Sequence, residues 1–232
     1  MLAVQLAVLA LTTVVLGSAG IIVCLVVPGG RCLMPLARLW SRIILGVCRV
    51  RWRVCLEGRD PPSQPAVYVA NHQSLLDIPA LVLAMPVDFR IVAKRSLLYV
   101  PVFGWALWLA GFIFIERHDR ERAIRSLDRA ANTIRDGTSI VVFAEGTRSR
   151  DGNLLPFKKG GFVLALQAGV PVIPVSLAGG HAVLAKGSLR VRPGEITVRF
   201  GAPIDTGRYS MQSKDDLIDA VRARIIAGLK RI

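Results

Sequence analysis

Val67–Asp77 reads VYVANHQSLLD, an apolar run that passes through a polar turn to an acid. The first four residues predict a short buried strand. Pro79 predicts that a helix begins close to Asp77, because proline is tolerated near the start of a helix but not in its interior. The stretch is therefore expected to form a strand, a turn and a helix, with His72 in the turn.

His72 and Asp77 have the residue types and the order of a general-base pair. An acid beside a histidine can hold the neutral imidazole in one tautomer, which leaves the other ring nitrogen free to take a proton. No serine or cysteine nucleophile is needed if the substrate supplies the hydroxyl, so the pair indicates acyl transfer onto an alcohol. The structural alternative is a capping box formed by Ser74 and Asp77, with His72 as an ordinary loop residue. The two interpretations are compatible.

Outward from this stretch, apolar strand-like runs alternate with helix-like segments. Strands are predicted at 52–56, 66–70, 89–93, 112–115, 139–144, 172–177 and 196–200, and helices at 77–85, 119–135, 162–167 and 213–229. This alternation predicts an α/β fold with a mixed, largely parallel sheet flanked by helices. The apolar region 97–110 is predicted as core, and a lipid-facing surface or an acyl pocket is the alternative.

Residues 1–30 contain no charged side chain. About 27 apolar residues, each rising 1.5 Å along a helix, could cross a hydrocarbon core of roughly 30 Å. No basic residue precedes the segment, so a cleaved signal peptide is not indicated, and we expect a retained, membrane-embedded helical segment. Gly17-Ser18-Ala19-Gly20 interrupts it, so a single tilted span and a hairpin within one leaflet both stay open.

The region after this segment carries four arginines spaced 7, 4 and 7 residues apart: Arg31, Arg38, Arg42 and Arg49. On a helix they would share one face, which predicts a basic amphipathic helix on an anionic membrane surface, with a solvated face packed on a core as the alternative. We expect residues 1–50 to be membrane-anchoring helices and residues 51–232 to be the α/β domain. Arginines after the apolar segment favour the cytoplasmic face of the membrane, here expected to be a bacterial inner membrane.

The net charge of +14 makes nucleic acid a second candidate partner. The sequence has no zinc-finger spacing, RNP-like aromatic strand or recognition-helix signature, so no nucleic acid partner is expected. Its three histidines lack ligand spacing, so no metal is expected. Its four cysteines form no C-x-x-C pair, which indicates reduced thiols.

Polar residues follow two further apolar runs, at the strand ends where ligands bind in α/β sheets. Gly111–Arg117 reads GFIFIER, Phe143–Ser149 reads FAEGTRS, and Lys158 and Lys159 come shortly after. Arginine suits bidentate phosphate binding, and Thr147 with nearby backbone N–H groups can complete a phosphate cradle. Taken singly, each stretch also has a structural interpretation, as a surface ion pair, a turn or a solvated loop.

Together with Asn71–Asp77 and a fourth block, Val170-Pro171-Val172-Ile173-Pro174-Val175, these stretches resemble the PlsC-type lysophosphatidic acid acyltransferases, a glycerolipid acyltransferase family. The resemblance covers residues 71–175 and continues loosely beyond. It implies an α/β domain with an N-terminal membrane-embedded helical pair. It also implies a thioester donor, acyl-CoA or acyl carrier protein, a lysophospholipid acceptor, no cofactor and no acyl-enzyme intermediate.

The resemblance further implies roles for individual residues. His72 would deprotonate the sn-2 hydroxyl of lysophosphatidic acid, and Asp77 would orient His72 and stabilise its imidazolium. The product would be phosphatidic acid, a step of phospholipid biosynthesis. The residues implied to position the acceptor and its phosphate are Arg117, Glu145, Gly146, Thr147, Arg148 and Lys94.

Two positions depart from the family pattern. Ala144 stands where the third block usually has proline, a change that is not expected to abolish activity. Lys94-Arg95-Ser96-Leu97 stands where the family usually has lysine-x-glutamate-leucine, and the missing acid could shift acceptor preference. Glycerol-3-phosphate, lysophosphatidylglycerol or a phosphate-free lyso-aminolipid therefore stay open as acceptors. So do a thioesterase in which His72 activates water and a module that only binds anionic lipid.

Overall fold

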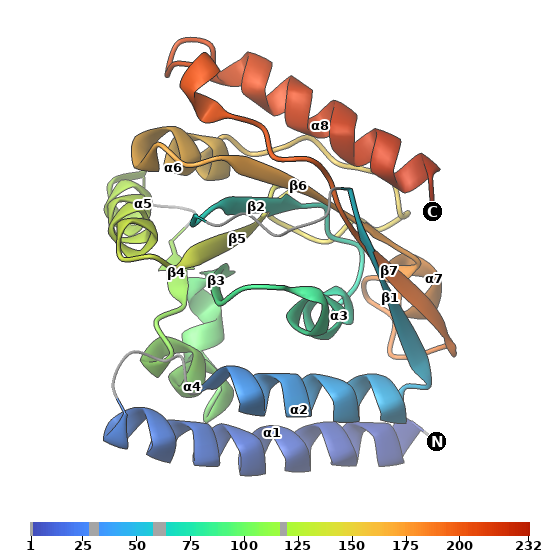
Figure 1. The fold of residues 1–232 in the computed structure, drawn as a ribbon. Helices are drawn as coiled ribbons and strands as arrows, with labels where there is room; N and C mark the ends of the chain where they lie inside the picture. The colour runs from blue at the N-terminus through green and yellow to red at the C-terminus, as the bar shows by residue number, and fades with distance from the viewer. Residues whose placement is uncertain (1, 28–32, 58–63, 117–119) are drawn as a thin grey trace.

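The computed structural model describes residues 2–27, 33–57, 64–116 and 120–232 (Figure 1). Its strands are β1 (Val50–Leu56), β2 (Val67–Ala70), β3 (Phe89–Lys94), β4 (Ile113–Ile115), β5 (Ser139–Phe143), β6 (Val172–Ala178) and β7 (Gly194–Phe200). They form one seven-stranded sheet in the order β1-β7-β6-β2-β5-β3-β4. Neighbouring strands run parallel except β6 and β7, which are antiparallel. The predicted mixed, largely parallel sheet is confirmed.

The helices are α1 (Leu2–Val26), α2 (Leu33–Val47), α3 (Asp77–Ala84), α4 (Phe103–Leu109), α5 (Arg120–Arg135), α6 (Gly160–Ala168), α7 (Gly180–Val183) and α8 (Lys214–Lys230). In Figure 1, α5, α6 and α8 lie over one face of the sheet, and α3 lies under the other. α2 packs on α3, and α1 forms the outermost layer on α2. Two short 3₁₀ turns, Arg95–Tyr99 and Thr206–Arg208, complete the regular structure.

The central strand β2 explains why helices cover both faces. Val67 and Val69 pack into a hydrophobic cluster with residues of α5, α6 and α8, whereas Tyr68 and Ala70 pack into a second cluster with residues of α3. All four residues are buried. A strand buried on both sides needs an apolar side chain at every position, as VYVA provides.

The predicted strands and helices are present, with ends that differ by at most two residues. β1 is an edge strand, and its apolar residues Trp52 and Val54 are exposed, although their alternation is the usual sign of a strand with one buried face. The alternation therefore located the strand correctly, but it does not mark a face that packs on the core.

The apolar N-terminal segment forms one continuous helix, α1, of 25 residues. The small residues at 17–20 do not interrupt it: a side chain at Gly20 would overlap Leu33, so this glycine lets α2 approach closely. Trp40 Nε1 donates to Thr13 Oγ1 at 3.0 Å, and Gln5 Nε2 donates to Val47 O at 3.4 Å. α1 and α2 therefore run antiparallel along their lengths.

α1 is long and apolar enough to cross a membrane by length and composition. The mean hydropathy of Ala3–Val26 is 2.5, and 11% of the residues in its most apolar 18-residue stretch are buried inside the protein. Among the described residues it is the one helix with these properties. The largely exposed apolar surface of α1 indicates membrane association.

The predicted row of four arginines on α2 is partly wrong. Arg49 lies beyond the end of the helix in a left-handed turn with φ 55°, so it does not continue the face. Arg31 lies outside the described residues. Arg38 and Arg42 are on the helix, half-buried and exposed respectively. The same helix buries Ile44 and Leu45 in the hydrophobic cluster that also contains residues of the sheet.

The apolar region 97–110 was predicted as core, and this is wrong for its tryptophans. Trp105 and Trp108 of α4 are 53% and 63% exposed, whereas the small residues Gly104 and Ala106 are buried. α4 packs against α1. The exposed tryptophans therefore belong to the same part of the molecule as the exposed apolar surface of α1.

Candidate active site

The turn after β2 and the loop after β5 lie at the same edge of the sheet. β2 pairs with β5 in parallel, with Ala70 opposite Phe143, so the chain leaves both strands side by side. Residues 71–77 follow the first strand, and residues 144–152 follow the second. The structure thus brings the first and third sequence blocks together, as expected for the carboxyl ends of parallel strands.

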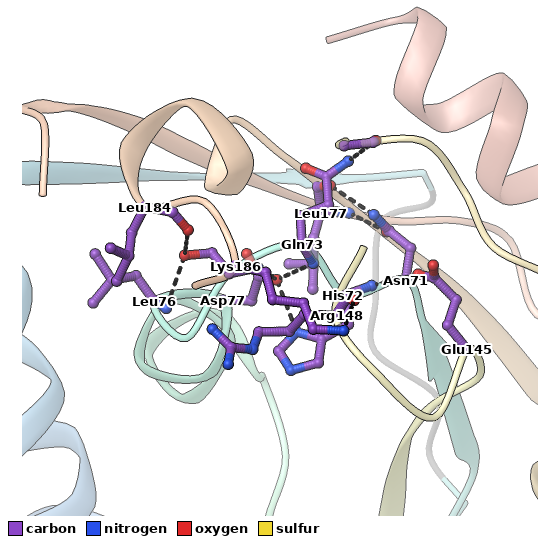
Figure 2. A network of polar contacts seen from close by, with 12 residues as sticks. Asn71, His72, Gln73, Leu76, Asp77, Glu145, Arg148, Leu177, Leu184 and Lys186 are labelled. Carbon is purple, nitrogen blue, oxygen red and sulfur yellow. Dashed lines mark hydrogen bonds and ion pairs between the residues drawn. The ribbon is translucent and has the colours of Figure 1, made fainter. Parts of the chain in front are cut away.

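His72 and Asp77 form a hydrogen-bonded pair (Figure 2). His72 Nδ1 lies 2.9 Å from Asp77 Oδ2, and the His72 side chain is 13% exposed while that of Asp77 is fully buried. A carboxylate only accepts, so in the neutral imidazole the proton is on Nδ1 and the lone pair is on Nε2. The imidazole stacks on Phe143, with ring centroids 4.0 Å apart. This geometry fixes the ring and leaves one nitrogen able to take a proton.

Asp77 also satisfies backbone donors, as the structural alternative requires. The backbone N–H groups of Gln73 and Ser74 each donate to Oδ2 at 2.7 Å. Ser74 does not complete a capping box, because its Oγ donates to Leu184 O and accepts from Leu76 N. One carboxylate oxygen therefore shapes the turn and orients His72 at the same time.

The main chain of His72 is held by the loop after β5. Its N–H donates to Glu145 Oε1 at 2.7 Å, and its C=O accepts from Ser149 N at 2.9 Å. The other Glu145 oxygen accepts from Leu155 N at 2.8 Å. Burial raises the pKa of the Glu145 carboxyl, and the hydrogen bonds from Leu155 and His72 act in the opposite direction.

The contacts of Glu145 in the structure are with the main chain of the protein itself. The residue was assigned to the acceptor, but its carboxylate is buried and both oxygens bind backbone N–H groups. Such an arrangement holds the main chain of His72 in place. Sequence reasoning placed Glu145 in the site but could not see that its partner, the His72 amide, lies 73 residues away in the chain.

Asn71 is a residue whose part in the site was missed. Its amide oxygen accepts from Leu177 N at 2.7 Å, and its amide nitrogen donates to Leu177 O at 2.9 Å. These two bonds tie the end of β2 to β6, so the residue before His72 cannot shift along the sheet. The available signal was its place in the first block.

Gly180 is a second residue that was missed. Asp77 Oδ1 is buried without a hydrogen-bond partner among the described residues, and a Cβ at Gly180 would overlap it. The added carbon would also come within 3.0 Å of Ser74 Cβ. The absence of a side chain at Gly180 therefore lets the Asp77 carboxylate occupy its position beside His72.

The rest of the third block forms a cationic turn. Gly146 has φ 68°, a conformation that favours glycine. Thr147 is exposed and Arg148 is half-buried. Lys186, from the loop after α7, donates through Nζ to Thr147 Oγ1 and to Arg148 O, each at 2.9 Å. Lys186 lies outside the four sequence blocks, so no pattern pointed to it.

Lys94, another predicted cation, lies away from this turn in the sheet. Lys94 is the exposed last residue of β3, two strands from β2, and its side chain forms no ion pair within the described part of the chain. Arg117 lies outside the described residues. Both assignments stay predictions.

A cavity of about 650 Å³ lies beside β4, between α4 and α5. Leu98, Trp108 and Phe114 contribute apolar walls, and Arg95 and Arg129 contribute positive charge. Neither His72 nor Asp77 lines it. The region 97–110 therefore contributes to a cavity, although the His72–Asp77 pair does not line it.

Comparisons with known proteins identify the family of the chain. A protein-family model described as Acyltransferase matches residues 53–178, which include the turn, the loop and β6. A 1-acyl-sn-glycerol-3-phosphate acyltransferase of Limnanthes douglasii is 35% identical over 215 residues, covering 90% of this chain and 76% of the relative. The alpha form of the same enzyme from Homo sapiens is 38% identical over 173 residues, 74% of this chain and 61% of the relative.

A solved structure agrees with the fold. The crystal structure of the 1-acyl-sn-glycerophosphate (LPA) acyltransferase PlsC from Thermotoga maritima superposes with a TM-score of 0.80 at 24% identity. The match covers 100% of this chain and 95% of that one, so it includes α1 and α2. The dyad, the sheet edge that carries it and the extent of these matches lead to one conclusion: the chain belongs to the 1-acyl-sn-glycerol-3-phosphate acyltransferase family.

Proposed function

We propose that this protein transfers a fatty acyl group from a thioester donor to the sn-2 hydroxyl of lysophosphatidic acid, giving phosphatidic acid. The observation that carries the proposal is the His72–Asp77 pair, 2.9 Å apart, with Nε2 free of hydrogen bonds among the described residues. Relatives over most of the chain bear the name of this enzyme. The donor is acyl-CoA or acyl carrier protein.

In this mechanism His72 acts as the general base. Nε2 takes the proton of the acceptor hydroxyl as its oxygen attacks the thioester carbonyl, and the imidazolium is stabilised by Asp77. Collapse of the tetrahedral intermediate breaks the C–S bond, and the proton passes from His72 to the leaving thiolate. A positioned general base contributes roughly 10²–10⁴-fold to the rate. No acyl-enzyme forms, because the substrate supplies the nucleophile.

We assign the acceptor phosphate to the cationic turn. Arg148 can bind phosphate oxygens through its guanidinium, and Gly146 and Thr147 shape the turn beside it. Arg117 and Lys94 are proposed as further phosphate ligands on the strength of the family resemblance. Glu145 is proposed to position His72, because its oxygens bind the His72 and Leu155 amides.

We propose that residues 1–50 anchor the protein and that residues 51–232 carry out the transfer at the cytoplasmic face of a membrane. Antiparallel α1 and α2 favour an anchor within one leaflet. A spanning α1 would have to leave α2 and break the hydrogen bonds from Trp40 to Thr13 and from Gln5 to Val47. The exposed tryptophans of α4, on the helix that contacts α1, suit the interfacial region of a bilayer.

The test is product formation by detergent-purified protein supplied with labelled acyl-CoA or acyl carrier protein. The acceptors are lysophosphatidic acid, glycerol-3-phosphate, lysophosphatidylglycerol and a lyso-aminolipid. Labelled phosphatidic acid is the expected main product. A different lipid product would support acyl transfer but show that the acceptor is another lipid. Free fatty acid without transfer would indicate a thioesterase. The absence of any reaction with either donor would contradict the proposal.

A further inference from the structure

Lys186 brings a positive charge to the site from a loop that none of the sequence blocks includes. Its two hydrogen bonds, to Thr147 Oγ1 and Arg148 O, join this loop to the cationic turn. The cationic turn is also hydrogen-bonded to the main chain of His72, because Ser149 N donates to His72 O. Figure 2 shows Lys186, Arg148 and His72 within one network of polar contacts, in which Lys186 reaches the main chain of Arg148.

The charge of this group is not balanced within the described residues. Neither Lys186 nor Arg148 takes part in an ion pair there, and both atoms that accept from Lys186 are neutral oxygens. Lys186 is hydrogen-bonded to the turn that carries Arg148, so an anionic ligand bound at this turn would be attracted by both charges.

The carboxylates of the site are bound to other groups. Asp77 accepts from His72 and from two backbone amides. Glu145 accepts from two backbone amides, and Asp151 accepts from Ser149 and Asn153. The ligand that best balances the two cations is therefore an anion from outside the chain.

We propose that Lys186 binds the acceptor phosphate beside Arg148 and makes the site select a phosphate monoester over a phosphodiester. The inference rests on the proposed function. An ammonium group has three N–H donors, and Lys186 uses two of them on the turn, so one is left for the ligand. A phosphate monoester carries a charge of about −1.5 to −2 at neutral pH and three terminal oxygens.

A phosphodiester such as that of lysophosphatidylglycerol carries one negative charge and two terminal oxygens. It gains less from a second cation, because both its charge and its number of free acceptors are smaller. Lys186 would therefore contribute more to binding of lysophosphatidic acid than to binding of lysophosphatidylglycerol. Removal of the Lys186 charge should therefore reduce the difference in KM between lysophosphatidic acid and lysophosphatidylglycerol.

The experiment compares Lys186→Gln and Lys186→Arg with wild type and with Arg190→Gln. The last variant removes an exposed cation from the same loop and serves as the matched control. KM and kcat are measured for lysophosphatidic acid, for lysophosphatidylglycerol and for the donor in mixed micelles. The Kd of lysophosphatidic acid is measured by titration calorimetry, and thermal unfolding checks that each variant folds.

We expect Lys186→Gln to raise KM and Kd for lysophosphatidic acid by roughly tenfold to a hundredfold, the effect of losing a charged hydrogen bond. The donor KM and kcat should stay close to wild type, the lysophosphatidylglycerol KM should rise less, and Lys186→Arg should retain most of the affinity. An equal rise for both acceptors, a change confined to kcat or donor KM, no change, or the same effect from Arg190→Gln would overturn the inference.

The binding measurement separates this inference from the proposed function. If the wild-type protein binds lysophosphatidic acid but does not acylate it, the proposed function is contradicted. The Kd of Lys186→Gln for lysophosphatidic acid would still show whether Lys186 binds the phosphate. Wild-type protein that acylates it, with Kd unchanged by Lys186→Gln, would keep the function and remove the role. Wild-type protein that neither binds nor acylates it would overturn both.

Discussion

The turn that carries His72 and the turn that carries Arg148 lie at one edge of the sheet, yet their polar groups are arranged in opposite ways. Around His72, the backbone N–H and C=O, the Asp77 carboxylate oxygen and both Glu145 oxygens are all hydrogen-bonded within the protein. Around Arg148 and Lys186, positive charge has no carboxylate partner among the described residues. Apart from Asp77 Oδ1 and His72 Nε2, the polar atoms named in the first region bind other groups of the protein, whereas the charges of the second region are complementary to an anionic ligand.

This difference teaches where each kind of substitution should act. Changes in the His72 region should alter the chemical step and the stability of the fold, because each group there positions another. Changes in the Arg148 region should alter the affinity for the acceptor, because its charges are available to a ligand. The following predictions test that division, from the largest expected effect to the smallest.

Among the substitutions of residues around His72, Asp77→Asn should lower kcat most. The amide keeps the size of the side chain, but it cannot stabilise the imidazolium as a carboxylate does, and we expect a loss of roughly 10²–10⁴-fold. The measurement is kcat with saturating donor and lysophosphatidic acid. Asp136→Asn, which changes an exposed acid after α5, is the control and should behave as wild type. A folded Asp77→Asn protein within a few-fold of wild type would contradict the role of the pair.

Glu145→Gln should affect both stability and turnover. One oxygen becomes an amide NH₂, so either the His72 or the Leu155 backbone N–H faces another donor, at a cost of about 1–3 kcal/mol in the free energy of unfolding. Displacement of His72 should lower kcat by roughly tenfold to a hundredfold.

Denaturant unfolding and kcat check this expectation beside Glu121→Gln, an exposed substitution on α5. If Glu145 instead binds the acceptor directly, Glu145→Gln should raise the acceptor KM while stability and kcat stay unchanged. That result would move Glu145 from the His72 region to the region that binds the acceptor.

Gly180→Ala should lower kcat by roughly tenfold, because the new methyl group overlaps Asp77 Oδ1 and pushes the carboxylate away from its position beside His72. KM for both substrates should change little, since no cation moves. Gly160→Ala is the matched control, because its Cβ would meet nothing closer than 3.9 Å. A Gly180→Ala protein with normal kcat and a raised acceptor KM would contradict this, because it would assign Gly180 to the Arg148 region and not to the His72 region.

Gly46→Ala, outside both regions, should have the smallest effect. Gly46 lies within α2, and a Cβ there meets nothing within 4 Å, so alanine should stabilise the helix by about 0.5–1 kcal/mol. Thermal unfolding in detergent measures the shift, and kcat should equal that of wild type. A destabilised protein would show that α2 has a contact at this position which the structure lacks.

The sequence predicted the sheet because its signals are local. β2 is a run of apolar residues, α3 begins near Pro79, and α5 has a regular apolar face that buries Ala130 and Ile134. Each of these signals lies within one element. The order of the four blocks also brought His72, Asp77 and Arg148 onto one list of site residues before any geometry was known.

The remaining features depend on partners that are distant in the chain. Glu145 binds the amide of a residue 73 positions away, and Lys186 contacts Thr147 across 39 positions. The exposure of Trp105 depends on how α4 packs against α1. Arg49 leaves the helical face because the chain turns with a positive φ directly after α2. Spacing within a single element carries no information on any of these.

The central claim is that His72 removes the proton from the acceptor hydroxyl, and one measurement tests it most directly. Purified wild-type and His72→Ala proteins, shown to unfold at similar temperatures, are given labelled donor and lysophosphatidic acid at saturation, and the rate of phosphatidic acid formation is compared. The account predicts a loss of at least roughly 10²–10⁴-fold in His72→Ala. Turnover close to wild type in a folded His72→Ala protein would contradict it.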